Sequence, residues 1–165
     1  MDIEKLKKFE KLPPDVKRQL ALYMAKWKDK KNQTDIKGDF MSFVKHVWPD
    51  FIEGSHHKQV AQKFNEIANG KTKRVIINMA PRHTKSEFAS YLLPAWMVGR
   101  NPKLKIIQST NTTELSVRFG RKAKALMDTP EYKEIFETRL KEDSQAAGKW
   151  ETQQGGEYYA AGVGS

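Results

Sequence analysis

The residues best suited to chemistry lie in one short loop, where two cations and a hydroxyl follow an apolar run. Arg82, Lys85 and Ser86 stand in the order in which a phosphate-binding loop presents cations to the β- and γ-phosphates and a hydroxyl to Mg²⁺. Both glycines of the usual G-x-x-x-x-G-K-[ST] pattern are missing, because Met79 and Thr84 stand at those positions. The residues therefore predict nucleotide-phosphate binding by a loop whose backbone differs from the common form.

Three further residues shape this loop. Thr84 falls where the common pattern needs a positive φ, which a β-branched residue adopts only under strain. Pro81 fixes its own φ, so the cations of the loop could supply part of what loop geometry supplies elsewhere. His83, a single loop histidine, is expected to be a hydrogen-bonded spacer rather than a catalyst.

A strand before the loop and a helix after it would hold these side chains. Residues 75–79 form an apolar run, which predicts a strand in the interior of a sheet covered on both faces. A second run at 104–109 begins about 19 residues after Lys85, which leaves room for one crossover helix at 86–98. Pro94 should kink or shorten that helix. Together these elements predict a βαβ unit and an α/β fold.

Helices and a hairpin are expected around this unit. Apolar spacing after Pro13 predicts an amphipathic helix, followed by a polar connector at 28–33. Asn111 and Glu114 have the spacing of a capping box for a helix that Pro130 ends. The other predicted elements are helices at residues 40–47, 57–69 and 131–140, and a β-hairpin at residues 150–163.

Positive charge gathers in the middle third of the chain. Between Lys71 and Lys124 there are 12 Lys and Arg residues but only two acids, whereas the rest of the chain holds 18 of each, so this block carries the whole net charge of +10. Such a block suits a polyanion, and a solvated basic face is the alternative. The candidate nucleic-acid contacts on the helix after the second run are Arg118, Arg121, Lys122 and Lys124.

Several classes of protein are excluded by composition. The chain has no cysteine, its four histidines lack zinc spacing, and neither a long apolar run nor a secretory signal is present, so we expect an intracellular protein without a structural metal. Hydrolysis by a phosphate-loop enzyme also needs a strand that ends in acids. Asp143, in a helix-like stretch, and Glu157, in the hairpin, do not meet that need.

The loop and its flanks resemble the large terminase subunit of tailed bacteriophages. The resemblance rests on Ile76–Glu87, on His56-His57-Lys58 and on residues 150–164, and it covers roughly residues 40–165. Thr84 stands where many members of that family carry glycine.

The resemblance implies a partial P-loop NTPase of the RecA/helicase-like class, with a parallel sheet and flanking helices. Residues 1–35 would be a helical N-terminal extension, and residues 36–165 the N-terminal part of an ATPase domain without its acidic Mg²⁺-binding strand or nuclease domain. Arg82 and Lys85 would be catalytic, and Ser86 would bind Mg²⁺. The residues implied to bind ATP are Pro81, Arg82, His83, Thr84, Lys85, Ser86, Glu87, His57 and Gln59.

The implied function is the ATP-binding portion of a viral DNA-packaging motor, which couples ATP hydrolysis to translocation of double-stranded DNA into a procapsid. The implied partners are a portal protein, a small terminase subunit and further copies in a homo-oligomeric ring. If the gene is split, they also include a second polypeptide that carries the missing half. The implied location is the host cytoplasm and, transiently, the procapsid portal. This fragment alone is expected to be inactive. Two alternatives stay open: another helicase-like P-loop ATPase, and a non-enzymatic basic nucleic-acid-binding module.

Overall fold

The computed structural model describes residues 13–163, apart from the side chain of Gln145. The chain divides into two compact units, Met1–Asp35 and Ile36–Ser165. Residues 1–12 of the expected N-terminal extension, and Gly164 and Ser165 at the end of the resembling segment, lie outside the described residues. Among the helices within residues 13–163, none has the length and apolarity needed to cross a membrane.

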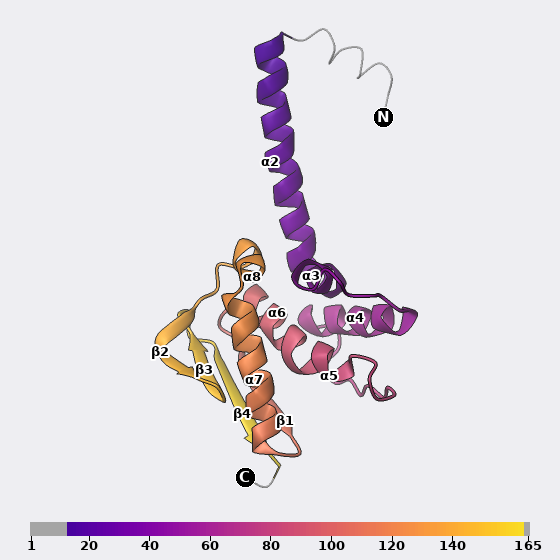
Figure 1. The fold of residues 1–165 in the computed structure, drawn as a ribbon, viewed down its shortest axis with the longest axis vertical. Helices are drawn as coiled ribbons and strands as arrows, with labels where there is room; N and C mark the ends of the chain where they lie inside the picture. The colour runs from indigo at the N-terminus through magenta and orange to yellow at the C-terminus, as the bar shows by residue number, and fades with distance from the viewer. Residues whose placement is uncertain (1–12, 164–165) are drawn as a thin grey trace. The chain divides into compact units, whose positions relative to one another are not determined.

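The first described element, α2 (Pro14–Gly38), is a single helix of 25 residues (Figure 1). Proline in its first turn has no N–H to leave unsatisfied, and Asp15 lies where the helix dipole favours a carboxylate. The prediction of a polar connector at residues 28–33 is wrong, because these residues are helical. They include good helix formers and neither proline nor glycine, so nothing interrupts the helix before Gly38.

The second unit combines helices with one mixed sheet, which makes it an α/β structure (Figure 1). Its helices are α3 (Phe40–Val47), α4 (Ser55–Ala68), α5 (Lys85–Glu87), the π-helical turn η1 (Phe88–Leu92), α6 (Leu93–Arg100), α7 (Thr113–Asp128) and α8 (Pro130–Ile135). Its strands are β1 (Lys105–Thr110), β2 (Leu140–Ala146), β3 (Lys149–Thr152) and β4 (Glu157–Gly162).

The sheet has the order β1-β4-β3-β2, and α7 packs against β1 and β4. β1 pairs with β4 in parallel, whereas the other neighbours are antiparallel. The predicted hairpin is confirmed as β3 and β4, with Gly155 in the turn at a φ of 91°. The predicted helix at 131–140 is only partly right, because α8 ends at Ile135 and β2 begins at Leu140, where pairing with β3 outweighs local helix preference.

The predicted interior strand at residues 75–79 is wrong. These residues form no strand, and the Ile76 side chain is 90% exposed. A strand needs a neighbour for its backbone groups, and β1 has only β4 beside it within the described residues. The expected βαβ unit is therefore not formed.

Two predicted helix features also differ from the structure. Thr112, not Asn111, caps α7, because its hydroxyl accepts a hydrogen bond from the Leu115 N–H at 3.3 Å. Pro94 does not end the helical stretch after the loop. The chain instead widens into η1, where the Leu93 N–H bonds to the Phe88 carbonyl, since proline cannot donate and its ring crowds the preceding turn.

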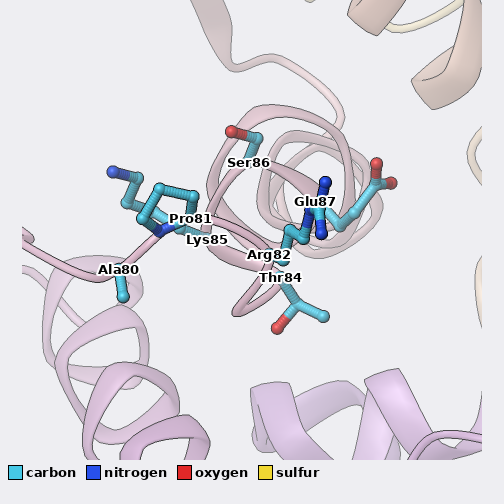
Figure 2. A pocket seen from close by; sticks show the side chains of 7 residues that line it. All are labelled: Ala80, Pro81, Arg82, Thr84, Lys85, Ser86 and Glu87. Carbon is cyan, nitrogen blue, oxygen red and sulfur yellow. The ribbon is translucent and has the colours of Figure 1, made fainter.

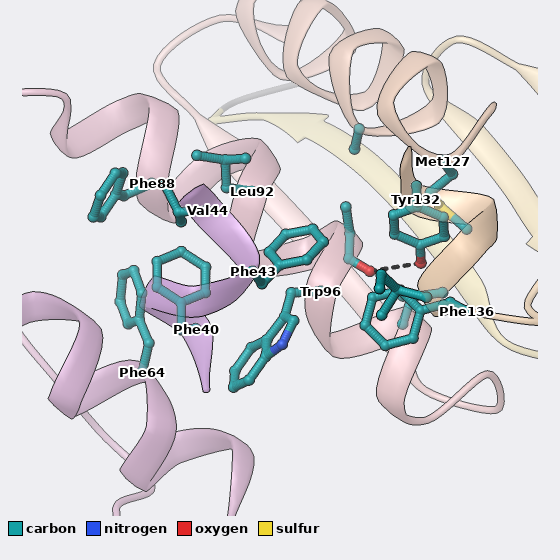
Figure 3. Close-up of a cluster of buried hydrophobic side chains, with 14 of the residues drawn as sticks. Phe40, Phe43, Val44, Phe64, Phe88, Leu92, Trp96, Met127, Tyr132 and Phe136 are labelled. Atoms are coloured by element: carbon teal, nitrogen blue, oxygen red, sulfur yellow. Dashed lines mark hydrogen bonds between the residues drawn. The ribbon is translucent and has the colours of Figure 1, made fainter. Parts of the chain in front are cut away.

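An aromatic core joins these helices (Figure 3). Phe40 is fully buried and makes edge-to-face contacts with Phe64, Phe88 and Trp96 at centroid distances of 5.1, 5.4 and 5.4 Å. The buried Tyr132 hydroxyl donates a hydrogen bond to the Ala95 carbonyl at 2.8 Å. Because Phe88 directly follows Glu87, this core positions the helical stretch that begins after the loop of residues 80–84.

Candidate functional site

The loop between residues 79 and 88 surrounds a concave pocket of about 420 Å³ (Figure 2). The pocket is open to solvent and lies where the helical stretch of α5, η1 and α6 begins. Its lining residues are Ala80, Pro81, Arg82, Thr84, Lys85, Ser86 and Glu87. The structure thus brings together six of the nine residues that the sequence implied for nucleotide binding.

Two non-glycine residues of the loop have left-handed backbones. Arg82 has a φ of 64° and Thr84 a φ of 58°. A β-branched residue in this region costs roughly 1–3 kcal/mol unless its surroundings hold it there. Thr84 therefore adopts the strained positive φ of the common pattern, whereas the sequence predicted a loop that avoids it through a different backbone, and the strain needs an anchor.

His57 of α4 is that anchor. Its Nδ1 accepts a hydrogen bond from the Gly54 N–H at 2.9 Å, and its Nε2 lies 2.7 Å from the Thr84 hydroxyl. The Thr84 hydroxyl in turn donates to the His83 carbonyl at 2.7 Å. Since Nδ1 is an acceptor, the imidazole is neutral and carries its proton on Nε2. His57 is 7% exposed, and both of its ring nitrogens are hydrogen-bonded within the protein. It therefore holds the loop in place and has no ring nitrogen left to contact a nucleotide.

The neutral form of His57 leads to a pH dependence. Burial lowers the pKa of His57 from its ordinary value of 6.5, and the neighbouring His56 lowers it further, whereas the contact of His57 with the His83 backbone and the charge of Glu53 act in the opposite direction. The unfolded chain therefore binds this proton at a higher pH than the folded chain does. The contribution of neutral His57 to the free energy of unfolding is fully present above pH 6.5. It falls as the pH drops below that value, by at most about 1.4 kcal/mol per pH unit for one proton.

We expect the denaturant midpoint to fall between pH 7.5 and pH 5.5, and to fall less in a His57→Gln variant. Urea unfolding at several pH values measures this. The variant keeps His46, His56 and His83, so the difference between the two profiles isolates His57. Identical pH profiles of the denaturant midpoint for the parent protein and the His57→Gln variant would show that His57 does not cause the pH dependence.

Lys85, Ser86 and Arg82 supply the groups that a phosphate needs. The Lys85 ammonium donates a long hydrogen bond of 3.4 Å to the Met79 carbonyl. The side chains of all three residues line the pocket and are exposed (Figure 2). Two cations, one hydroxyl and the first N–H groups of a helical stretch form a donor set that suits an anion. His83 bonds back to the Pro81 carbonyl at 2.9 Å, as expected for a spacer.

Glu87 connects the loop to α7. Its carboxylate accepts hydrogen bonds from the Lys122 ammonium at 2.8 and 2.9 Å, and that ammonium also lies 5.3 Å from the Tyr91 ring centroid. Lys122, predicted as a nucleic-acid contact, is thus engaged within the protein. The sequence offered no signal for this pair, because the two residues are 35 positions apart.

A second pocket of about 490 Å³ lies between α4 and the extended residues 75–79. Gln59, predicted as a nucleotide contact, lines it, and so does His56, whose Nε2 is buried without a hydrogen-bond partner among the described residues. His57 does not line it. Because Met79 of this pocket precedes Ala80 of the first, the two pockets follow one another along the chain.

The four predicted nucleic-acid contacts on α7 differ in their surroundings. Arg118 and Arg121 are exposed, whereas Lys122 and Lys124 are half-buried, and both lysines have interactions within the protein. Arg118 and Arg121 are therefore the better placed of the four to meet a phosphate backbone.

The described residues contain no group of three or more His, Asp or Glu side chains that could hold a metal ion. Ser86 is the predicted Mg²⁺ ligand, and the nearest carboxylate in sequence, that of Glu87, is paired with Lys122. Asp143 lies on β2, not in a helix as the sequence suggested, and Glu157 begins β4 beside Lys149 at 3.6 Å. Neither acid is among the residues that line the loop pocket.

Comparison of the sequence with protein-family models, with curated proteins and with solved structures gave no match. The functional assignment therefore depends on the loop residues, their backbone conformation and the donors that they bring to one pocket.

Proposed function

We propose that this chain is the ATP-binding portion of a DNA-packaging motor of the large-terminase type. The observation that supports this most is the pocket of the loop, where Arg82, Lys85 and Ser86 surround a left-handed turn at Thr84. In this role the chain acts in the host cytoplasm, as part of a ring at the procapsid portal. The double-stranded DNA, the portal protein and the small terminase subunit belong to the same proposal.

The fold that we infer for the complete domain is a P-loop NTPase of the RecA/helicase-like class. The α/β sheet with its packed helices supports it, and so do two apolar surfaces that further strands could cover. One is the exposed Ile76 side chain in residues 75–79, and the other is the sheet face of β1 that carries Ile107, which is 78% exposed. The outer edge of β1 also has no partner strand within the described residues. An uncovered strand edge of this kind favours pairing with another chain.

Each loop residue has a distinct role in this proposal. Lys85 neutralises charge on the β- and γ-phosphates, and Arg82 responds to the γ-phosphate. Ser86 offers its hydroxyl to Mg²⁺, which would bridge phosphate oxygens and offset their charge. Gln59 and His56 line the adjoining pocket, which is large enough for the base.

Hydrolysis requires acids that hold Mg²⁺ and orient water. No strand in residues 13–163 places a free pair of acids beside the loop pocket. We therefore expect nucleotide binding with negligible turnover, and we infer that the acids come from another segment or from a second polypeptide.

The direct test is titration with a fluorescent ATP analogue. Lys85→Ala should weaken binding at least tenfold, because a charge-assisted contact to phosphate contributes about 1.5–3 kcal/mol. Lys103→Ala removes an exposed lysine outside both pockets and should leave the affinity unchanged. Equal affinities of the Lys85→Ala variant and the parent protein would contradict nucleotide binding in this pocket.

The exposed arginines of α7 favour a second candidate, a nucleic-acid-binding module. Replacing Arg118 and Arg121 together by alanine should lower the slope of log affinity for DNA against log salt by about 2, since each lost phosphate contact removes about 0.9. Fluorescence anisotropy with labelled duplex DNA at several salt concentrations measures this. Binding that is unaffected by Lys85→Ala, in a protein without nucleotide affinity, would favour the module, whereas stimulation of turnover by RNA would favour another helicase-like ATPase.

A further inference from the structure

Helix α2 carries an exposed apolar seam. Val16, Tyr23, Met24 and Trp27 are 38%, 68%, 59% and 58% exposed. Together with Leu20 they fall within an arc of about 100° on a helix that turns 100° per residue. Positions 16, 20, 23 and 27 follow the 4-3-4 spacing of core positions in a two-stranded coiled coil. The face thus has the pattern of a helix-packing surface.

The positions that flank this seam are basic. In the heptad that places Leu20 and Trp27 at position a, the flanking e and g positions hold three lysines and no acid: Lys17, Lys26 and Lys31. The acids of α2 all lie on its outer face: Asp15, Asp29 and Asp35. The Lys31 ammonium lies 5.4 Å from the centroid of the Trp27 ring, at the border of the seam. A helix that packs here meets positive charge on both sides.

We propose that residues 16–31 of α2 bind an amphipathic helix of a partner protein whose own apolar seam is bordered by Asp or Glu. Carboxylates at the partner's e and g positions would face Lys26 and Lys31, which is how such positions select a partner. Trp27 and Tyr23 would be the main anchors, since large aromatic side chains dominate interface energies.

Two other occupants fit this surface less well. A second copy of the chain would bring lysines against lysines along the flanks, which costs affinity. A lipid surface needs one broad apolar face on the helix, whereas Leu22, 58% exposed, lies on the opposite side of α2 from the seam.

The proposal is tested with the full chain and two labelled three-heptad peptides, both with Leu at a and d, one with Glu and the other with Lys at e and g. Fluorescence anisotropy should show binding of the Glu peptide only, weakening as salt is added. Lys26→Glu with Lys31→Glu should weaken that binding at least tenfold and allow the Lys peptide to bind. Trp27→Ala should also weaken it at least tenfold.

Arg18→Glu is the matched control, because it reverses a charge on the exposed outer face and should change the affinity less than twofold. Circular dichroism checks that each variant keeps the helix content of the parent. Equal binding of the two peptides, or failure of the charge reversal to alter binding, overturns the proposal. So does dimer formation by the chain alone in sedimentation velocity that Trp27→Ala abolishes, or binding confined to vesicles of phosphatidylserine and phosphatidylcholine.

Discussion

Phe40→Ala should destabilise the second unit by about 3–5 kcal/mol, the usual cost of removing a buried phenylalanine from a packed core. Phe40 is fully buried, and its ring contacts rings from α4, η1 and α6. Alanine would leave a cavity where these elements meet, and the rings around it cannot all move inward together. Urea or guanidinium unfolding followed by circular dichroism measures the loss.

The same change should disturb the loop pocket. Phe88 directly follows Glu87, the last residue of α5. Loss of the Phe40–Phe88 contact should therefore make the first helical turn, which carries Lys85 and Ser86, less rigid. Ile52→Ala serves as the control, because Ile52 is 87% exposed and its loss should change stability by less than about 0.5 kcal/mol. An unchanged denaturant midpoint for Phe40→Ala would show that the aromatic core does not hold these helices together.

His57→Ala should release the loop that lines the first pocket and lower stability by about 2–4 kcal/mol. It leaves the half-buried Gly54 N–H without its acceptor and removes the His57 contact of the Thr84 hydroxyl, which keeps only its bond to the His83 carbonyl; a polar group left without its partner costs about 1–3 kcal/mol. The left-handed Thr84 then has no side-chain anchor from α4. Amide hydrogen exchange of residues 82–87 should become faster, and affinity for an ATP analogue should fall about tenfold if the loop binds nucleotide.

A double-mutant cycle with Thr84→Gly separates anchoring from general damage. Glycine adopts a φ of 58° without strain, so the loop should need His57 less in the Thr84→Gly background. We expect a coupling of about 1 kcal/mol between the two sites, read from the exchange rates of the loop amides. His46→Ala is the control, because that side chain bonds to the Glu131 carbonyl and should leave the loop amides unaffected. Strictly additive effects would rule out the anchor, whether or not nucleotide binds.

Local patterns predicted much of the helical structure. The spacing of apolar residues predicted helices at residues 40–47 and 57–69, which correspond to α3 and α4, and the expected stops before Pro49 and at Asn69-Gly70 lie at the ends of these helices. Two strand-like runs around the Gly155-Gly156 turn likewise predicted the β3–β4 hairpin. These signals act within one or two turns of chain, so they can be read without knowing the rest of the fold.

Local patterns failed where a strand required a distant partner. Residues 75–79 have β-branched residues suited to a strand, but nothing within residues 13–163 pairs with them. β2 is polar and shows no strand signal, but β3 offers it a backbone edge. Whether a segment becomes a strand therefore depends on pairing as well as on its own residues.

The candidate site shows the same division. The sequence by itself indicated the cations and the hydroxyl at positions 82, 85 and 86, because residue type alone shows which groups can meet a phosphate. It also indicated that a positive φ at Thr84 would be strained, because Thr is β-branched. The anchor of Thr84 by His57 could not, since it joins residues 27 positions apart, and neither could the pairing of Glu87 with Lys122. Residue chemistry is carried by single side chains, whereas a strained loop is held only by contacts that folding brings together from different elements.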